Sequence, residues 1–109
     1  SNTRYQKNTN IGIIMVDLTS TESWEDTTNY FSELQRYCIH VTFYVIVFTK
    51  KDMDEDHVVS ESDIKEFMMT SITDFDICCV EINTTSAPDV EHLFEFILHR
   101  WISKQKKMI

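Results

Sequence analysis

Three short apolar runs alternate with amphipathic stretches along the chain. They span residues 11–16, 41–48 and 77–82, and each is rich in β-branched or aromatic residues without a clean polar alternation. Runs of this length and composition are typical of strands that are buried on both faces of a sheet. The pattern therefore predicts three strands, each covered on both sides.

A helical pattern follows the first run. Thr19 and Glu22 have the spacing of a capping box, in which the two side chains bond each other's backbone N–H groups. Trp24, Phe31 and Leu34 then fall on one helical face. We expect this helix to pack its apolar face on the predicted sheet.

Helical patterns also follow the second and third runs. Ser60 and Asp63 predict a cap, and an apolar stripe of three residues comes after it, at Ile64, Phe67 and Met68. The clearest amphipathic helix lies near the end, with an expected core stripe at Val90, Leu93, Phe94, Ile97, Leu98 and Trp101. The resulting order, β-α-β-α-β-α, predicts an α/β fold with a parallel sheet, right-handed crossovers and flanking helices.

Charge and cysteine usage narrow the classes of partner and compartment. The net charge of −8 disfavours nucleic acid and anionic membranes as direct partners, since both require a basic face. No apolar run approaches the roughly 20 residues of a transmembrane helix. Cys38, Cys78 and Cys79 do not make a disulfide framework, and the last two are expected to be buried free thiols. We therefore expect a cytoplasmic protein, which as part of a full-length chain could be peripheral to membranes.

Basic residues gather near the end, at Arg100, Lys104, Lys106 and Lys107. One interpretation is a solvated helix end that complements the helix dipole. The other is a weak membrane-proximal tail. The final residues, Lys-Lys-Met-Ile, contain no prenylation motif.

Three loops would emerge at one edge of the predicted sheet, at residues 17–19, 49–52 and 83–87. Ligands of open parallel sheets bind beyond the carboxyl ends of the strands, which is where these loops lie. The second loop reads Thr49-Lys50-Lys51-Asp52 and directly follows a buried strand. It resembles the guanine-specificity loop of small GTPases, N/T-K-x-D.

The chemistry of guanine explains these residue types. Guanine presents two adjacent donors, and the carboxylate of Asp52 could accept both, whereas adenine offers no such edge. A site built on such bonds rejects the wrong analogue by roughly 10⁴-fold or more. The resemblance implies that Lys50 lays its alkyl stem along the base and that Thr49 ties neighbouring loops together.

Other segments extend the resemblance to the Rab type of Ras-superfamily GTPase, from about Ile11 to Trp101. Residues 17–25 are similar to a Rab strand end followed by a helix that begins Glu-Ser-Phe. Residues 53–67 resemble the acidic turn, Val-Val-Ser and helix that follow the specificity loop, and residues 90–94 resemble the start of the last helix. The resemblance implies a partial Ras-like G domain over residues 11–109.

The third loop departs from the family pattern, which reads Ser-Ala-Lys. Ser86-Ala87 fits only with a deletion before the final helix, whereas a gapless alignment places Asn83, Thr84 and Thr85 at the three positions. We prefer the gapless alignment, in which the backbone N–H of Thr84 would bond the guanine oxygen. The family's Lys is absent in both alignments.

The phosphate-binding half of the family pattern is absent from this sequence. With one glycine in the chain, no G-x-x-x-x-G-K-[ST] loop exists, and the Mg²⁺-holding residues and water-orienting Gln are also missing. The polar lead-in of residues 1–10 contains Arg4-Tyr5-Gln6, which resembles the end of a switch helix, and Ser1-Asn2 is the kind of scar that a cleaved tag leaves. We therefore assign no catalytic residue, and Mg²⁺ would bind only if the missing half were supplied.

Two other constellations contain the residue types of metal sites. His92, Glu95 and His99 share a helical face, but such groups usually form surface ion pairs. The acidic run at residues 52–56 lacks the glycine and the terminal Glu of an EF-hand, so a solvated turn is expected. We assign no metal site.

Two functions follow from these observations. The first is a partial Rab-like GTPase, a GTP/GDP-dependent switch that recruits effector or regulatory proteins in vesicle trafficking but does not hydrolyse GTP by itself. The alternative is a pseudo-GTPase, an interaction module that does not bind nucleotide. The resemblance also predicts an uncovered sheet edge, through which the chain would form a homodimer or swap segments, unless a missing companion segment covers it.

Overall fold

The computed structural model describes residues 10–37, 41–70 and 75–107. Nearly all of the predicted lead-in, including the segment similar to a switch helix, and Cys38 lie outside these residues. The described part contains a three-stranded parallel sheet in the order β1-β2-β3. The strands are β1 (Asn10–Asp17), β2 (Val41–Thr49) and β3 (Ile77–Glu81).

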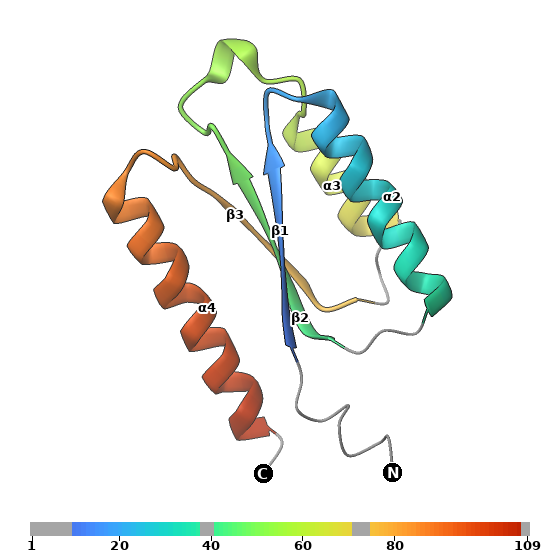
Figure 1. Ribbon diagram of the computed structural model, residues 1–109, viewed down its shortest axis with the longest axis vertical. Helices are drawn as coiled ribbons and strands as arrows, with labels where there is room; N and C mark the ends of the chain where they lie inside the picture. The colour runs from blue at the N-terminus through green and yellow to red at the C-terminus, as the bar shows by residue number, and fades with distance from the viewer. Residues whose placement is uncertain (1–9, 38–40, 71–74, 108–109) are drawn as a thin grey trace.

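Helices cover both faces of this sheet, which makes three layers (Figure 1). α2 and α3 lie on one face, and α4 lies on the other. The helices are α2 (Thr21–Tyr37), α3 (Glu61–Thr70) and α4 (Ala87–Lys107), and a short 3₁₀ turn, η1, spans Asp54–Asp56. The alternating order and the parallel pairing confirm the predicted α/β fold class.

The caps decide where two of the helices begin. Ser60 and Asp63 bond each other's backbone N–H groups at 3.1 and 3.0 Å, which confirms the predicted cap of α3. At α2 the prediction was wrong by one residue, because Ser20 and not Thr19 accepts the backbone N–H of Ser23, at 3.1 Å. Thr19 is not free to cap, since its N–H and hydroxyl both donate to the Asp17 carboxylate.

The larger core lies between the sheet and the pair α2 and α3. Phe31 is 1% exposed and packs on the rings of Tyr44, Phe67 and Phe75. The predicted apolar face of α2 is confirmed, with Trp24 and Leu34 packed into the same cluster. The stripe of α3 is confirmed as well, because its members Ile64, Phe67 and Met68 all contact this core.

The smaller core lies under α4. It contains alternate residues of β2, with Leu93 and Ile97 from the helix and Ile82 beyond β3. β2 is therefore buried on both faces, as predicted. The same prediction was wrong for β1, where Ile13 and Met15 are about half exposed on the α4 side. It was also wrong for β3, where Cys79 and Glu81 are exposed.

The expected core stripe of α4 is also only partly correct. Leu93 and Ile97 are buried, whereas Phe94 is 63% and Leu98 56% exposed, and Trp101 is exposed too. The reason is the lateral position of the helix, which covers β2 and β3 and leaves most of β1 uncovered. The stripe is wider than the sheet surface beneath it.

Asp76, just before β3, holds α4 in that lateral position. Its carboxylate bonds the Arg100 guanidinium at 2.5 Å and also pairs with the Lys104 ammonium. Burial alone would raise the pKa of Asp76, but the two cations lower it below its ordinary value. The Arg100 guanidinium also lies 5.5 Å from the centroid of the Phe43 ring. Two of the four basic residues near the end of the chain therefore attach α4 to the sheet.

Two further expectations concerned the state of the cysteines and the absence of a transmembrane helix. Cys78 and Cys79 are free thiols, as predicted, but neither is buried, since Cys78 is partly exposed and Cys79 is exposed. Across the described stretches, no helix has the length and apolarity needed to cross a membrane.

Candidate functional site

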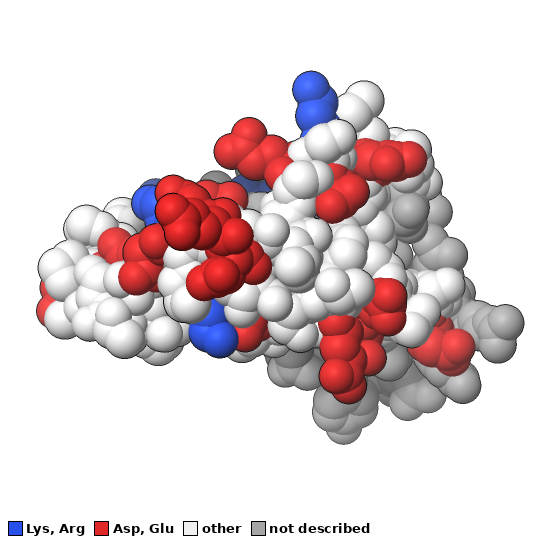
Figure 2. All heavy atoms as spheres, turned by 90° about the horizontal axis from the view of Figure 1, so that it is seen from above, with Lys and Arg blue, Asp and Glu red and all other residues white. Residues whose placement is uncertain are grey.

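The carboxyl ends of the three strands bring the three predicted loops together. Backbone bonds tie them: Leu18 N–H donates to Thr49 O at 3.3 Å, and Lys51 N–H donates to Ile82 O at 3.2 Å. Figure 2 looks down on this edge, where acidic side chains outnumber basic ones. The juxtaposition that the topology predicted is thus present, in an acidic setting.

Thr49 ties the second loop to the first strand. It is the last residue of β2, and its hydroxyl donates to the carbonyl of Val16 in β1 at 3.3 Å. The bond spans 33 residues of sequence and joins neighbouring strands at their carboxyl ends. The hydroxyl of Thr49 therefore holds the start of the second loop against the end of β1.

Lys50 begins the loop in a left-handed conformation, with φ of 62°. A non-glycine residue adopts this conformation at a cost, so the surrounding structure must hold it there. Its carbonyl accepts the backbone N–H of Met53 at 3.1 Å and lies 2.8 Å from Nε2 of His57. Two donors therefore fix the turn on which the specificity loop is built.

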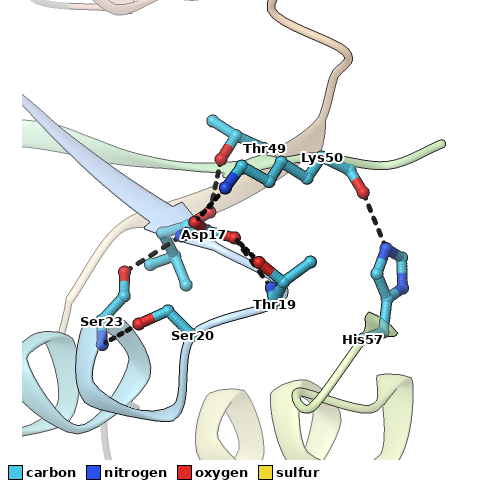
Figure 3. A network of polar contacts seen from close by, with 8 residues as sticks. Asp17, Thr19, Ser20, Ser23, Thr49, Lys50 and His57 are labelled. Atoms are coloured by element: carbon cyan, nitrogen blue, oxygen red, sulfur yellow. Dashed lines mark hydrogen bonds and ion pairs between the residues drawn. The ribbon is translucent and has the colours of Figure 1, made fainter. Parts of the chain in front are cut away.

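The Lys50 side chain reaches back to the first loop. Its ammonium lies 2.7 Å from Oδ2 of Asp17 (Figure 3). The other carboxylate oxygen, Oδ1, accepts the N–H and the hydroxyl of Thr19 at 2.8 and 2.7 Å. The backbone N–H of Asp17 itself donates to Ser23 Oγ at 3.0 Å. Asp17 is thus fixed from both sides and holds the ammonium of Lys50 at the sheet edge.

The ion pair changes the acidity of Asp17. The bond from the Lys50 ammonium, followed by the bond from the Thr19 hydroxyl, lowers the pKa of Asp17 to about 2 from its usual 3.8. A lowered pKa means that the native state favours the carboxylate. The stabilisation is therefore present above about pH 4 and is lost as the pH falls from about 4 towards 2.

Asp17→Asn is expected to remove this stabilisation. The Asn variant should be less stable than the wild type by about 1 kcal/mol at pH 6, after allowance for screening of the half-exposed Lys50 ammonium. Urea unfolding between pH 6 and 2 measures the difference. It should shrink below about pH 4, and a difference that stays constant down to pH 2 would contradict the role of the Asp17 carboxylate.

Asp52 lines a cavity of about 690 Å³ next to the start of α3. Its side chain is exposed, so its carboxylate is accessible to a ligand. Of the predicted guanine contacts, Asp52 and Asn83 line this cavity, whereas Thr49, Lys50, Thr84 and Thr85 do not. Among the residues that the structure describes, five carboxylates line the cavity, from Asp52, Asp54, Glu61, Glu81 and Asp89.

The third loop is a compact turn between β3 and α4. Oδ1 of Asn83 accepts the backbone N–H and the hydroxyl of Thr85 at 3.1 and 2.7 Å. No described residue accepts a hydrogen bond from the backbone N–H of Thr84. Ser86 caps α4, since its hydroxyl accepts the N–H of Asp89 at 3.3 Å. Asn83 to Thr85 therefore form the loop proper, and Ser86 already belongs to the helix start.

Three residues that shape these loops were not predicted from the sequence as site residues. The sequence placed Asp17 in a loop and gave no role to His57 or Asp89. Yet His57 supports the Lys50 turn, and the Asp89 carboxylate accepts the N–H of Asn83 at 2.8 Å. The position of Asp89 three residues after Ser86 was an available capping signal, whereas no sequence pattern links His57 to a carbonyl seven residues earlier.

The two candidate metal constellations find no support in the geometry. His92, Glu95 and His99 are exposed on α4, and η1 is an exposed acidic turn. Within residues 10–37, 41–70 and 75–107, no group of three or more His, Cys, Asp or Glu side chains is arranged to hold a metal ion.

Comparison with known proteins supports the resemblance carried by these loops. None of the curated proteins searched matches the chain. A family model described as the Ras family matches residues 1–103, which is nearly the whole sequence. Together with the parallel sheet and the position of the Thr49–Asp52 loop, this match shows that the chain belongs to the Ras family.

Proposed function

We propose that this chain is the guanine-reading part of a Rab-type GTPase switch. The observation that carries the proposal is the Thr49–Asp52 loop, which is held at the carboxyl ends of the strands. Thr49 is tied to β1, the Lys50 turn is fixed by two donors, and the Asp52 carboxylate is exposed. A loop with these properties offers a preorganised acceptor for the two donors of guanine.

The other predicted contacts fit this role to different degrees. The Lys50 ammonium is held by Asp17, which extends the alkyl stem across the sheet edge, where a base could stack on it. The backbone N–H of Thr84, which no described residue accepts, is a donor that could bond the guanine oxygen. Asn83 and Thr85 bond each other, so we propose that they shape the third loop and do not contact the base.

Affinity for the phosphates is expected to be low. The sequence contains no phosphate loop, and among the described residues that line the cavity beside Asp52, five are carboxylates and one is a lysine, Lys51. Negative charges at this density repel a polyphosphate. We therefore propose that the base and ribose supply the binding energy in this chain, and that Mg²⁺ acts only with the phosphate-binding half.

The proposed cellular role is that of the Rab type, recruitment of effector or regulatory proteins in vesicle trafficking. It rests on the sequence resemblance of residues 17–25, 53–67 and 90–94. The alternative is a pseudo-GTPase that keeps the fold as an interaction module. Two observations favour the alternative: the third loop has no lysine, and the surroundings of Asp52 are acidic.

Calorimetric titration of guanosine, GDP and adenosine into the purified chain tests the proposal. We expect guanosine to bind as well as GDP or better, adenosine not to bind, and Asp52→Ala to abolish binding. Asp54→Ala serves as the matched control, because Asp54 is an exposed acid beside the same cavity but outside the T-K-x-D pattern. Absence of heat with guanosine would favour the pseudo-GTPase.

A further inference from the structure

The outer edge of β1 is open within the described part of the chain. β1 pairs with β2 along its whole length and with no other described strand. Alternate backbone N–H and C=O groups of β1 therefore point away from the sheet. Natural edge strands usually carry a charge, a proline or a strong bulge that prevents further pairing. Between Asn10 and Asp17, β1 contains only apolar residues and one glycine, and its register irregularity is confined to Asn10 and Ile11.

The same edge is bordered by exposed apolar side chains on one face of the sheet. Ile13 and Met15 are 50% and 52% exposed, on the side that α4 only partly covers. On α4, three apolar residues are exposed along one flank, namely Phe94, Leu98 and Trp101, and Ile102 is exposed next to Leu98 on the outer face of the helix.

Helical spacing shows that this flank of α4 is turned towards β1. The opposite flank carries Arg100, which is bonded to Asp76 at the start of β3. Leu93 and Ile97 face the sheet between the two flanks, and α4 runs antiparallel to the strands (Figure 1). The exposed residues of β1 and α4 therefore form one apolar surface next to an unpaired strand, which we call the β1–α4 surface (Ile13, Met15, Phe94, Leu98, Trp101 and Ile102).

We propose that the β1–α4 surface binds a second copy of this chain. A two-fold axis perpendicular to the sheet would pair β1 with β1 of the partner in antiparallel orientation and make a continuous six-stranded sheet. A rotation about that axis does not exchange the two faces of the sheet. Both α4 helices would therefore lie on the same face, with their exposed flanks turned to each other. In a register centred on Ile14, Ile13 of each copy lies opposite Met15 of the other.

The charge along β1 and the apolar area available for burial are compatible with a second copy of the chain at this surface. In that register the apolar stretch of β1 pairs with itself, so no like charges meet along the strands, and Asp17 lies opposite Ile11. The six exposed side chains offer roughly 600 Å² per copy, and the new strand pairing adds to it, against roughly 800 Å² per partner in a standard interface. The net charge of −8 on each copy opposes association, so salt should strengthen the dimer.

Sedimentation velocity of the full chain under reducing conditions tests the proposal. We expect a dimer in the micromolar range, tighter at about 0.5 M than at about 0.05 M salt. Met15→Lys and Leu98→Lys should each weaken dimerisation at least about tenfold, since each places a charge in the interface from a different element. Both side chains are more than half exposed in the monomer, so the urea midpoint of unfolding should change little.

Met69→Lys is the matched control. Met69 is 66% exposed on α3, across the sheet from the β1–α4 surface, so its substitution should leave the dimer intact. A monomeric wild type at roughly 100 µM would overturn the proposal. So would equal effects of Met69→Lys and Met15→Lys, which would indicate association through another surface. Guanosine binding is measured separately, so failure of the dimer and failure of the proposed function are distinguishable.

Discussion

Replacing Phe31 with alanine is expected to remove about 3–5 kcal/mol of the free energy of unfolding. Phe31 is 1% exposed, and its ring centroid lies 5.1 Å from that of Tyr44, 5.9 Å from that of Phe67 and 5.6 Å from that of Phe75. Its removal leaves a cavity between α2, α3 and the sheet that neighbouring rings cannot fill. Since the total free energy of unfolding of a domain of this size is about 5–15 kcal/mol, much of the population would unfold.

Urea unfolding followed by circular dichroism measures this loss, and Tyr30→Ala is the control. Tyr30 is adjacent in sequence and also contacts the Phe31 ring, at 5.6 Å between centroids, but it is 44% exposed. Its truncation should cost about 1 kcal/mol or less. Equal losses for the two variants would mean that Phe31 is not the centre of this core.

Gly12→Ala is expected to destabilise the chain by about 1–3 kcal/mol or more, because there is no space for a methyl group. An added Cβ would lie 2.5 Å from Cε1 of Tyr44, and closer still to Cδ1. The Tyr44 ring is only 2% exposed and is held between the rings of Phe31 and Phe75, so it cannot move aside. Gly12 is needed here because the ring lies across the backbone of β1.

A double-mutant cycle with Tyr44→Leu isolates that clash. Tyr44→Leu alone should destabilise the core, but Gly12→Ala added to the Tyr44→Leu variant should cost much less than in the wild type. The measured quantity is the difference between the two Gly12→Ala effects on the free energy of unfolding. If the effects are equal, the cost of Gly12→Ala arises from something other than the Tyr44 ring.

The order and type of the elements could be predicted from the sequence because each apolar run is strand-length and each helical stripe has a clear period. The lateral position of a helix on the sheet could not be predicted in this way. The stripe on α4 predicts which residues are apolar, but not that Asp76 draws Arg100 and Lys104 towards β3 and leaves Phe94 and Leu98 exposed. Periodicity carries no information about a contact between residues 24 positions apart.

In the candidate site, too, some features could be predicted from the sequence and others could not. The T-K-x-D pattern predicted the loop, and the strand end placed Thr49 where its hydroxyl bonds the neighbouring strand. The partner of Lys50 and the donor from His57 depend on how the loops fold back, which short-range patterns do not encode. The α2 cap was mispredicted for a related reason, because Asp17 competes for Thr19.

The most direct test of guanine recognition by the Thr49–Asp52 loop is a titration of the ¹⁵N-labelled chain with guanosine, followed by amide chemical shifts. We predict saturable shifts at Lys50, Lys51, Asp52 and Thr84, no such shifts with adenosine, and loss of the response in Asp52→Ala. Unchanged amide positions in this loop at millimolar guanosine, or equal shifts with adenosine, would contradict guanine recognition by this chain.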